Sequence, residues 1–307
     1  MFGLFLVFTL QGIVDTYGAL SVSGSKVVGK SGSPAALHGV SFGWHNWWPE
    51  FYTADTVKHL AEDWKATVLR AAIGVEPDGG YLQDSSLGDQ CATTVADAAI
   101  ANGIYVILDW HQHRINQDAA IKFFTKFVTK YKGVPNVIYE IFNEPESATW
   151  PEVKQYANAV IKVIRDIDPD ALVLVGCANW DQKITEPAAD PLVGFGNVAY
   201  TLHFYAATHT QWLRDDAQKA IDAGLPIFVS ECGGMESSGD GAINQNEWNN
   251  WISFLDKNSI SWVAWSISNK AETCSMITTT GPVNPPWPDS GLSEWGKLVK
   301  KLMISIA

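Results

Sequence analysis

The sequence predicts an α/β fold of one domain, a (β/α)8 barrel (TIM barrel) in which eight parallel strands alternate with helices. Three observations support this prediction. Eight short apolar runs rich in β-branched residues alternate with stretches whose apolar residues recur at helical spacing. The runs are continuously apolar, as in parallel strands that are buried on both faces. The chain has 307 residues, and such a barrel commonly fills about 250.

The elements follow one another in a regular order. The predicted strands are the apolar runs at residues 37–42, 67–73, 105–110, 137–142, 172–177, 198–204, 227–230 and 262–267. The predicted helices cover residues 53–63, 90–102, 118–131, 151–166, 182–189, 211–223, 246–258 and 293–304. Asn102-Gly103 is a typical helix end, and Ser293 is placed to cap the last helix.

A doubly wound open sheet is the alternative fold for this order of elements. It would need a glycine-rich turn after the first strand, where a phosphate approaches the backbone. The first strand runs instead into Gly43-Trp44 and further bulky residues up to Trp48, which leave no room for a pyrophosphate. Neither a linker nor a repeat indicates a second domain. We therefore expect one barrel domain over residues 19–307.

Composition narrows the class of protein and its partners. Hydrophobic residues make up 47% of the chain and charged residues 18%, so the chain can bury a large core and is not disordered. The net charge of −12 has the wrong sign for binding nucleic acid or an anionic membrane surface. Tryptophan (14 residues) outnumbers tyrosine (9), an excess that a core alone does not explain.

Residues 1–18 are expected to be a secretory signal peptide. The apolar stretch 2–14 is too short to span a bilayer, and the small residues Gly18 and Ala19 that follow it suit cleavage. The alternative is a buried N-terminal strand or an amphipathic segment that leads into the domain. We expect a secreted, extracellular monomer that has no membrane segment.

The four cysteines Cys91, Cys177, Cys232 and Cys274 are too far apart in sequence for a zinc knuckle. A secreted protein can join them in two disulfides, and Cys232 with Cys274 is the pair we expect, because both would follow late strands at one end of the fold. The alternative is that all four are buried free thiols.

Polar residues gather where the predicted strands end, which is where the active sites of such barrels lie. They are Arg70, Asp109, His111, Asn143, Glu144, His203, Tyr205 and Glu231. Taken alone, Glu144 could simply accept hydrogen bonds from backbone N–H groups at the start of a helix. However, the fourth and seventh strands of a barrel lie across from each other, so Glu144 at the end of one would face Glu231 at the end of the other. Two carboxylates about 5 Å apart act as nucleophile and acid/base in retaining glycoside hydrolysis.

A metal-dependent hydrolase is the rival hypothesis. His111 and His113 form an H-x-H at a strand end, and His203 and His209 are further candidate ligands. Such a site would also need an aspartate on strand eight, where this chain has Trp265-Ser266. We therefore expect neither a metal nor an organic cofactor.

Six tryptophans fall at predicted strand ends or in the loops that follow. They are Trp44, Trp47, Trp48, Trp110, Trp180 and Trp265. Flat apolar faces at the mouth of a barrel can stack on sugar rings, while the indole N–H binds a hydroxyl group. The aromatic excess thus indicates a neutral sugar polymer as the partner.

The segment 137–145 reads VIYEIFNEP and resembles the strand-four signature of glycoside hydrolase family 5. The segments around Arg70, His111, Tyr205 and Glu231 resemble the motifs of strands two, three, six and seven in its cellulase subfamily. The resemblance extends over about residues 37–300. It implies a (β/α)8 endo-β-1,4-glucanase that retains anomeric configuration and acts on a β-1,4-linked glucan.

The resemblance also implies roles for individual residues. Glu144 would be the acid/base and Glu231 the nucleophile, with Arg70 and Tyr205 keeping the nucleophile ionised and oriented. Arg70 is thus expected to lower the pKa of Glu231, while Glu144 keeps its proton. His111 and His203 would line the cleaving subsite, and Asn143 would bind the 2-hydroxyl of the sugar.

More distant positions would hold the sugar chain. Trp265, Trp47 and Trp180 resemble stacking platforms, and Lys270 and Glu272 match polar binding positions, with solvated loop charges as the alternative. Gly43 stands where related bacterial enzymes place a histidine, which makes His45 the candidate for that subsite. Gly74 and Cys232 stand where enzymes of that family often have aromatic residues. These differences from the family pattern bear on substrate preference and not on the cleavage machinery. A mannanase, a xylanase and a glycan-binding barrel without catalysis remain the alternative functions.

Overall fold

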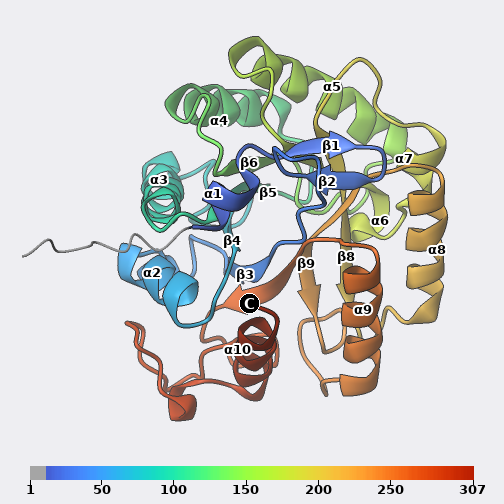
Figure 1. Ribbon diagram of the computed structural model, residues 1–307. Helices are drawn as coiled ribbons and strands as arrows, with labels where there is room; N and C mark the ends of the chain where they lie inside the picture. The colour runs from blue at the N-terminus through green and yellow to red at the C-terminus, as the bar shows by residue number, and fades with distance from the viewer. Residues whose placement is uncertain (1–11) are drawn as a thin grey trace, which may run out of the picture.

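A computed structural model describes residues 12–307, and its centre is a closed barrel of eight parallel strands (Figure 1). The strands are β3 (His38–Phe42), β4 (Val68–Gly74), β5 (Tyr105–His111), β6 (Val137–Glu140), β7 (Val173–Val175), β8 (Val198–Tyr205), β9 (Ile227–Gly233) and β10 (Trp262–Ile267). Neighbours in sequence are neighbours in the barrel, and β10 closes the ring by pairing with β3. The (β/α)8 barrel is therefore confirmed.

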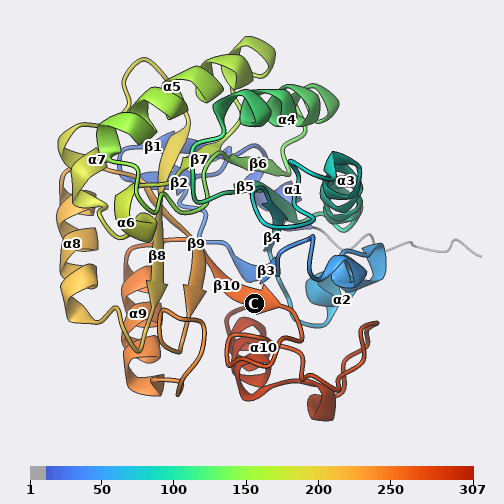
Figure 2. The ribbon, with the colours of Figure 1, turned by 180° about the vertical axis from the view of Figure 1, so that it is seen from behind.

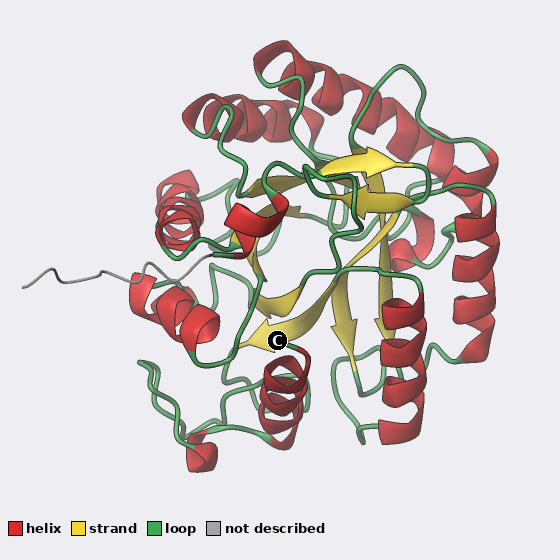
Figure 3. Ribbon diagram, in the orientation of Figure 1, coloured by secondary structure: helices red, strands yellow, loops and turns green. Residues whose placement is uncertain are grey.

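Helices surround the barrel on its outer side (Figure 3). They are α2 (Ala54–Glu62), α3 (Ser85–Ala101), α4 (Gln117–Lys130), α5 (Trp150–Ile167), α6 (Ala178–Asp181), α7 (Thr185–Ala189), α8 (Gln211–Asp222), α9 (Gln245–Lys257) and α10 (Glu294–Ile306), with the 3-10 turns η1 (Pro49–Phe51) and η2 (Asp289–Gly291). The short α6 and α7 lie between α5 and α8, as Figure 2 shows from behind. No helix among residues 12–307 is long and apolar enough to cross a membrane.

Helix boundaries follow the capping residues. Ser293 accepts a hydrogen bond from the backbone N–H of Gly296, as predicted for the start of the last helix. Helix α3 corresponds to the predicted helix 90–102 but begins at Ser85, five residues before the predicted start. The reason is that the Asp84 side chain accepts hydrogen bonds from the first free N–H groups. The predicted helix at 182–189 is present as the shorter α7, and the tight turn α6, which the sequence did not predict, precedes it.

A small hairpin, which the sequence did not predict, lies in front of the barrel in Figure 1. Its strands β1 (Ser21–Ser23) and β2 (Lys26–Val28) follow the short helix α1 (Ile13–Tyr17). Val27 packs into the apolar cluster inside the barrel, and the Tyr105 hydroxyl donates to the Gly18 carbonyl at 2.6 Å. The predicted signal peptide falls largely on residues 1–11, which lie outside the described residues, so its cleavage stays a prediction.

The barrel interior changes from apolar to polar along its axis. Alternate residues of each strand point inward. At the N-terminal end the inward residues form an apolar cluster that includes Val68, Ile107, Ile138 and Phe228. Two positions further along the same strands, the residues are polar and fully buried: Arg70, Asp109, Glu140 and Ser230. The polar layer therefore lies at the end of the barrel where the sequence predicted the site.

The predicted disulfide between Cys232 and Cys274 is wrong. All four cysteines are buried free thiols within the described residues, which was the alternative. The Cys232 thiol faces the Val263 carbonyl (3.3 Å), whereas the Cys274 thiol faces the Glu272 carboxylate (3.1 Å). The two sulfur atoms follow late strands, but they point to different partners.

We expect Ile107→Ala to lower the free energy of unfolding by about 2–5 kcal/mol, because it leaves a cavity in the closed interior of the barrel. Urea denaturation followed by circular dichroism measures the loss. Ile304→Ala, on the outer face of α10 where the side chain is 46% exposed, is the control and should cost less than about 0.5 kcal/mol. Equal losses in the two variants would contradict the layered core.

Candidate active site

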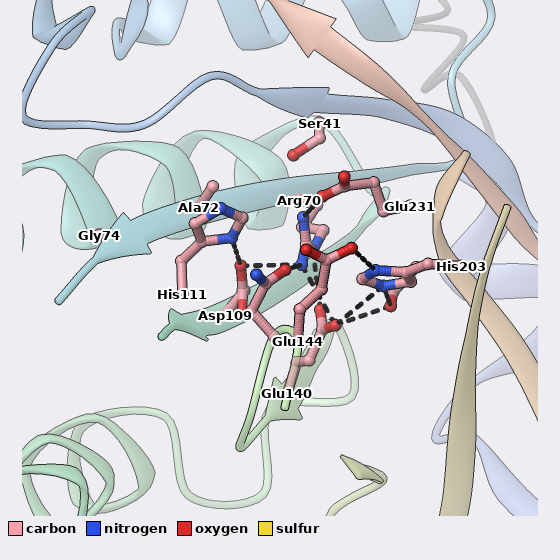
Figure 4. Close-up of polar contacts among 12 residues, drawn as sticks. Ser41, Arg70, Ala72, Gly74, Asp109, His111, Glu140, Glu144, His203 and Glu231 are labelled. Carbon is pink, nitrogen blue, oxygen red and sulfur yellow. Dashed lines mark hydrogen bonds and ion pairs between the residues drawn. The ribbon is translucent and has the colours of Figure 1, made fainter. Parts of the chain in front are cut away.

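Arg70 lies at the centre of the polar layer and binds four side chains (Figure 4). Its Nε donates to Glu140 Oε2 at 2.8 Å, and its Nη1 donates to Glu231 Oε2 at 2.9 Å. Its Nη2 donates to Asn143 Oδ1 at 2.6 Å and lies 3.0 Å from Asp109 Oδ2. The predicted contact between Arg70 and Glu231 is therefore present, together with three that the sequence did not predict.

The charges of this cluster stabilise one another. Burial alone would lower the pKa of Arg70, but the carboxylates of Asp109, Glu140 and Glu231 raise it well above its usual range. Burial likewise opposes the charge of Glu140, but Arg70 outweighs this effect and lowers the pKa of Glu140. Removing one member would leave uncompensated charge in the interior.

Glu144 and Glu231 face each other across the mouth of the barrel. An oxygen of each carboxylate and a ring nitrogen of His203 all lie within 4.8 Å of one another. Glu231 is held at both oxygens, by Arg70 and by the Tyr205 hydroxyl, which donates at 2.7 Å. Glu144 contacts two imidazoles: Nδ1 of His203 at 2.9 Å and Nε2 of His113 at 3.4 Å.

The pKa shifts of the two carboxyls differ from the expectation. Burial and the charge of Glu144 raise the pKa of Glu231, although His203, Arg70 and Tyr205 oppose this. Burial also acts on Glu144, but hydrogen bonds from His113 and His203 outweigh it and lower the pKa of Glu144. The physical reason is the number of partners. Arg70 is the single cation shared by three carboxylates, so it stabilises the charge of Glu231 only in part, whereas Glu144 alone contacts two imidazoles.

His203 joins the acid/base candidate to the rest of the polar layer. Its Nδ1 contacts Glu144, and its Nε2 lies 2.9 Å from Ser230 Oγ. Burial lowers the pKa of His203, but the surrounding carboxylates, with Asp181 first among them, raise it well above its usual range. These contacts therefore favour the positively charged form of His203.

His111 is a second buried histidine of the mouth. Its Nδ1 lies 2.6 Å from Asp109 Oδ2, and its ring stacks parallel to Trp265 at 5.3 Å between centroids. The edge of the ring meets Trp44 at 4.2 Å. Burial and the charge of Arg70 lower the pKa of His111 well below its usual range, so it stays neutral.

Cavities open on both sides of the carboxylate pair. One of about 570 Å³ is lined by Glu144, Glu231, Trp180, His203 and Ser237, among others. A second of about 180 Å³ is lined by Glu144, Glu231, Tyr205, Trp47, Trp265, Lys270 and Glu272, among others. Because the same two carboxylates line both cavities, the site is a cleft that extends past them in two directions.

The predicted platforms differ in exposure. Trp47 is 49% exposed and Trp180 is 40% exposed, so each presents a free aromatic face at the cleft, whereas Trp265 is largely buried behind His111. Lys270 and Glu272 form an ion pair at 2.5 Å at the edge of the smaller cavity. Trp110, also predicted at the mouth, is instead fully buried and packs on Phe123, because its side chain points out of the barrel.

His45 does not reach the cleft. It is fully buried, its Nδ1 accepts from the Gly74 backbone N–H at 3.0 Å, and burial lowers its pKa to about 4. Trp44 occupies the mouth instead and stacks on His113 at 5.5 Å. A side chain at position 74 would come within 2.6 Å of the Trp44 ring, so Gly74 makes room for this tryptophan.

The site contains polar residues that the sequence did not predict, and one whose contacts it did not predict. Glu140, Ser230 and Asp181 were not predicted, although a carboxylate within the apolar run of β6 was a signal for Glu140. Asp109 was noted only as a polar strand end, yet it binds both Arg70 and His111. Asp181 gave no signal, because its burial depends on the fold of the α6 turn.

The histidines of the metal hypothesis are not arranged around one point. Nδ1 of His111 is bound to Asp109, His113 contacts Glu144, and Nδ1 of His209 accepts from the Tyr205 backbone N–H at 2.8 Å. Within residues 12–307, the group of side chains that could converge on one ion is Glu144, His203 and Glu231. These are also the groups that a carboxylate mechanism uses.

We expect Arg70→Met to lower the free energy of unfolding by about 3–5 kcal/mol at pH 7, because buried carboxylates lose their partner. The pKa of Glu140 is depressed, so its stabilisation is present above the unfolded pKa and is lost as pH falls. The deficit of the variant should thus narrow only as pH falls from the unfolded pKa of 4.5 toward the lower folded pKa, and it should be smaller at pH 3 than at pH 7. Urea denaturation at both pH values measures this, with Lys162→Met at an exposed pair as the control. A uniform deficit at both pH values would argue against the charge cluster.

Comparison with known proteins agrees with this geometry. The family model "Cellulase (glycosyl hydrolase family 5)" matches residues 28–271. Endoglucanase Z of Dickeya dadantii is 43% identical over 99% of this chain and 70% of its own length. An endoglucanase of Clostridium saccharobutylicum is 36% identical over 92% of this chain and 64% of its own length. The chain thus spans roughly two thirds of these relatives.

Solved structures show the same fold. One from Cytophaga hutchinsonii is 43% identical with a TM-score of 0.94, covering 96% of this chain and 97% of that one. The catalytic domain of the Thermobifida fusca endoglucanase is 31% identical with a TM-score of 0.89, covering 95% and 99%. A variant of that domain is known in complex with cellotetraose. This chain therefore belongs to glycoside hydrolase family 5, the cellulase family, and is a glycoside hydrolase.

Proposed function

We propose that this protein is a secreted, monomeric endo-β-1,4-glucanase that cleaves internal bonds of β-1,4-glucans with retention of configuration. The observation that carries the proposal is the carboxylate pair: oxygens of Glu144 and Glu231 lie within 4.8 Å in a cleft that continues on both sides. Carboxyl groups about 5 Å apart suit double displacement, whereas inversion needs about 6.5–9.5 Å for a water molecule. A cleft that continues on both sides of the carboxylates can hold sugar units on both sides of the bond that is cleaved, as cleavage inside a polymer requires.

In the first step Glu231 attacks the anomeric carbon, and the bond to the leaving oxygen breaks. Arg70 and Tyr205 hold both oxygens of Glu231, which fixes the direction of attack. Glu144 donates a proton to the leaving oxygen. Among the described residues, Glu144 contacts two proton donors, His203 and His113, so its proton must be supplied within this group.

In the second step Glu144 acts as a base. It takes a proton from a water molecule that attacks the glycosyl-enzyme, and Glu231 leaves as a carboxylate. Two displacements at one carbon restore the original configuration. The buried Nδ2 of Asn143 has no hydrogen-bond partner among the described residues, which supports the proposal that it binds the 2-hydroxyl of the sugar.

A neutral polymer is the substrate class that fits the cleft. The exposed rings of Trp47 and Trp180 suit sugar faces, and the net charge of −12 disfavours polyanions. The cellotetraose complex of the Thermobifida fusca relative and the names of the other relatives support a β-1,4-glucan over mannan or xylan. The apolar segment 2–14 supports secretion.

Glu144→Gln and Glu231→Gln should each lower kcat on carboxymethylcellulose by about 100-fold or more, because each removes a proton-transfer or nucleophilic group. Release of reducing ends measures the rate, and circular dichroism checks the fold. Glu62→Gln, at the exposed end of α2, is the matched control and should keep wild-type activity.

An activated aryl cellobioside separates the two roles. Its leaving group needs no proton, so Glu144→Gln should still form the glycosyl-enzyme, whereas Glu231→Gln should not. NMR of the first product should show the β-anomer. Wild-type turnover in either variant, or an initial α-anomer, would reject the proposed mechanism, and a stable wild type that binds but never cleaves glucan would indicate a glycan-binding barrel.

Chelation tests the metal hypothesis directly. Because no step of the proposed mechanism uses a metal ion, activity should be unchanged after dialysis against EDTA, as measured on the same soluble glucan. The control is EDTA-treated protein to which Zn²⁺ or Ca²⁺ is returned. A loss on chelation that a metal restores would favour an ion held by Glu144, His203 and Glu231.

A further inference from the structure

Asp181 is a fully buried carboxylate directly after the platform Trp180. Its Oδ1 accepts a hydrogen bond from the Cys177 backbone N–H at 2.5 Å. Its Oδ2 lies 3.4 Å from Nε2 of His203 and has no hydrogen-bond partner among the described residues. An unpaired buried carboxylate oxygen is costly, so a use for its charge is to be expected.

The backbone around Asp181 is also strained. Asn179, Trp180 and Asp181 have φ values of 59°, 52° and 59°, in the left-handed region that residues with a side chain rarely adopt. The bond from Cys177 to Asp181 closes this turn. A Cβ at Gly176 would lie 2.7 Å from the Phe142 carbonyl oxygen and 3.0 Å from Asp181 Oδ1, so the glycine leaves room for both groups. The turn thus fixes Trp180 and Asp181 together.

The hydrogen bonds fix where the protons of His203 lie. Ser230 Oγ donates its proton to Glu140 Oε1 at 2.7 Å, so it accepts from His203 Nε2 at 2.9 Å. Nε2 therefore carries a hydrogen whether or not the ring is charged. The remaining proton lies between His203 Nδ1 and Glu144 Oε1, which are 2.9 Å apart.

We propose that Asp181 is a positioning residue, which retains the proton that His203 and Glu144 share so that Glu144 can act as the acid. The inference rests on the proposed function. Burial raises the pKa of Asp181 well above its usual range, and the charge of His203, 3.4 Å away, opposes this rise. In its ionised form Asp181 favours the hydrogen on Nε2 and the positive charge of the ring, so the His203–Glu144 pair holds its proton to higher pH. The shared proton moves from Nδ1 to Glu144 and then to the leaving oxygen, and the water of the second step returns it.

Other charged groups also face His203, but each of them is bound to further side chains. Glu140 is bound to Arg70 and Ser230, and Glu231 is bound to Arg70 and Tyr205. From β5 and the loops, the remaining titratable neighbours are Asp109, His111, His113 and His209. Asp181 differs because the Oδ2 that faces the ring has no second partner, which is consistent with its leading place among the charges that raise the pKa of His203.

Asp181→Asn is the test, because the amide keeps the shape and the acceptor for the Cys177 N–H. Removing the negative charge lowers the pKa of the shared proton. The alkaline limb of kcat/KM on soluble β-1,4-glucan should therefore shift to lower pH by about 1 unit, with little change in KM. Trp180→Ala is the matched control from the same turn: it should raise KM and leave the alkaline limb in place.

A profile of Asp181→Asn that superimposes on the wild type, or that falls by the same factor at every pH, would reject the proposal. NMR of wild-type protein with ¹⁵N-labelled histidine gives a second test that needs no variant. The His203 Nε2 should stay protonated through the alkaline limb while Nδ1 changes, and loss of the Nε2 proton first would overturn the inference. A wild type that hydrolyses no β-glucan rejects the proposed function instead, and the NMR titration still tests His203.

Discussion

Arg70 places one positive charge against three buried carboxylates, those of Asp109, Glu140 and Glu231, and these carboxylates in turn contact His111, Ser230 and Tyr205. Such a charge is stable inside a protein only when its partners surround it at hydrogen-bonding distance. The closed barrel provides this, because neighbouring strands bring inward residues of several segments to the same depth. The apolar layer beneath, which includes Ile107, keeps these positions rigid.

The same charge cluster explains why the two catalytic candidates differ. Glu231 shares Arg70 with two other carboxylates, and burial raises its pKa, while Glu144 contacts His113 and His203, which lower its pKa. The lowered pKa of Glu144 and the raised pKa of His203 favour the proton on the imidazole side of Glu144. The proposed mechanism needs the proton on Glu144, so in that mechanism the contact with His203 takes part in the chemistry as well as in the packing.

The cleft combines a rigid floor with exposed aromatic walls. The floor is the polar end of the barrel, whereas Trp47 lies in the loop after β3 and Trp180 in the tight turn α6 after β7, and both side chains stay largely exposed. Buried groups supply defined protonation and direction, and exposed rings supply contact area that tolerates many sugar positions. The left-handed turn at Asn179–Asp181 connects the two, since it holds a platform and a buried carboxylate in consecutive residues.

The sequence by itself determined the barrel, the order of its strands and the pairing of Glu144 with Glu231, because strand periodicity and strand-end polarity are local signals. It also indicated Arg70, His203 and Tyr205 through their positions at strand ends. Only the tertiary structure decided which side chains meet: Glu140 with Arg70, Asp181 with His203, Cys274 with Glu272 and not with Cys232, and His45 behind β4 and not in the cleft. The direction of a side chain depends on neighbours far away in sequence, and the pKa values depend on how those neighbours share their charge.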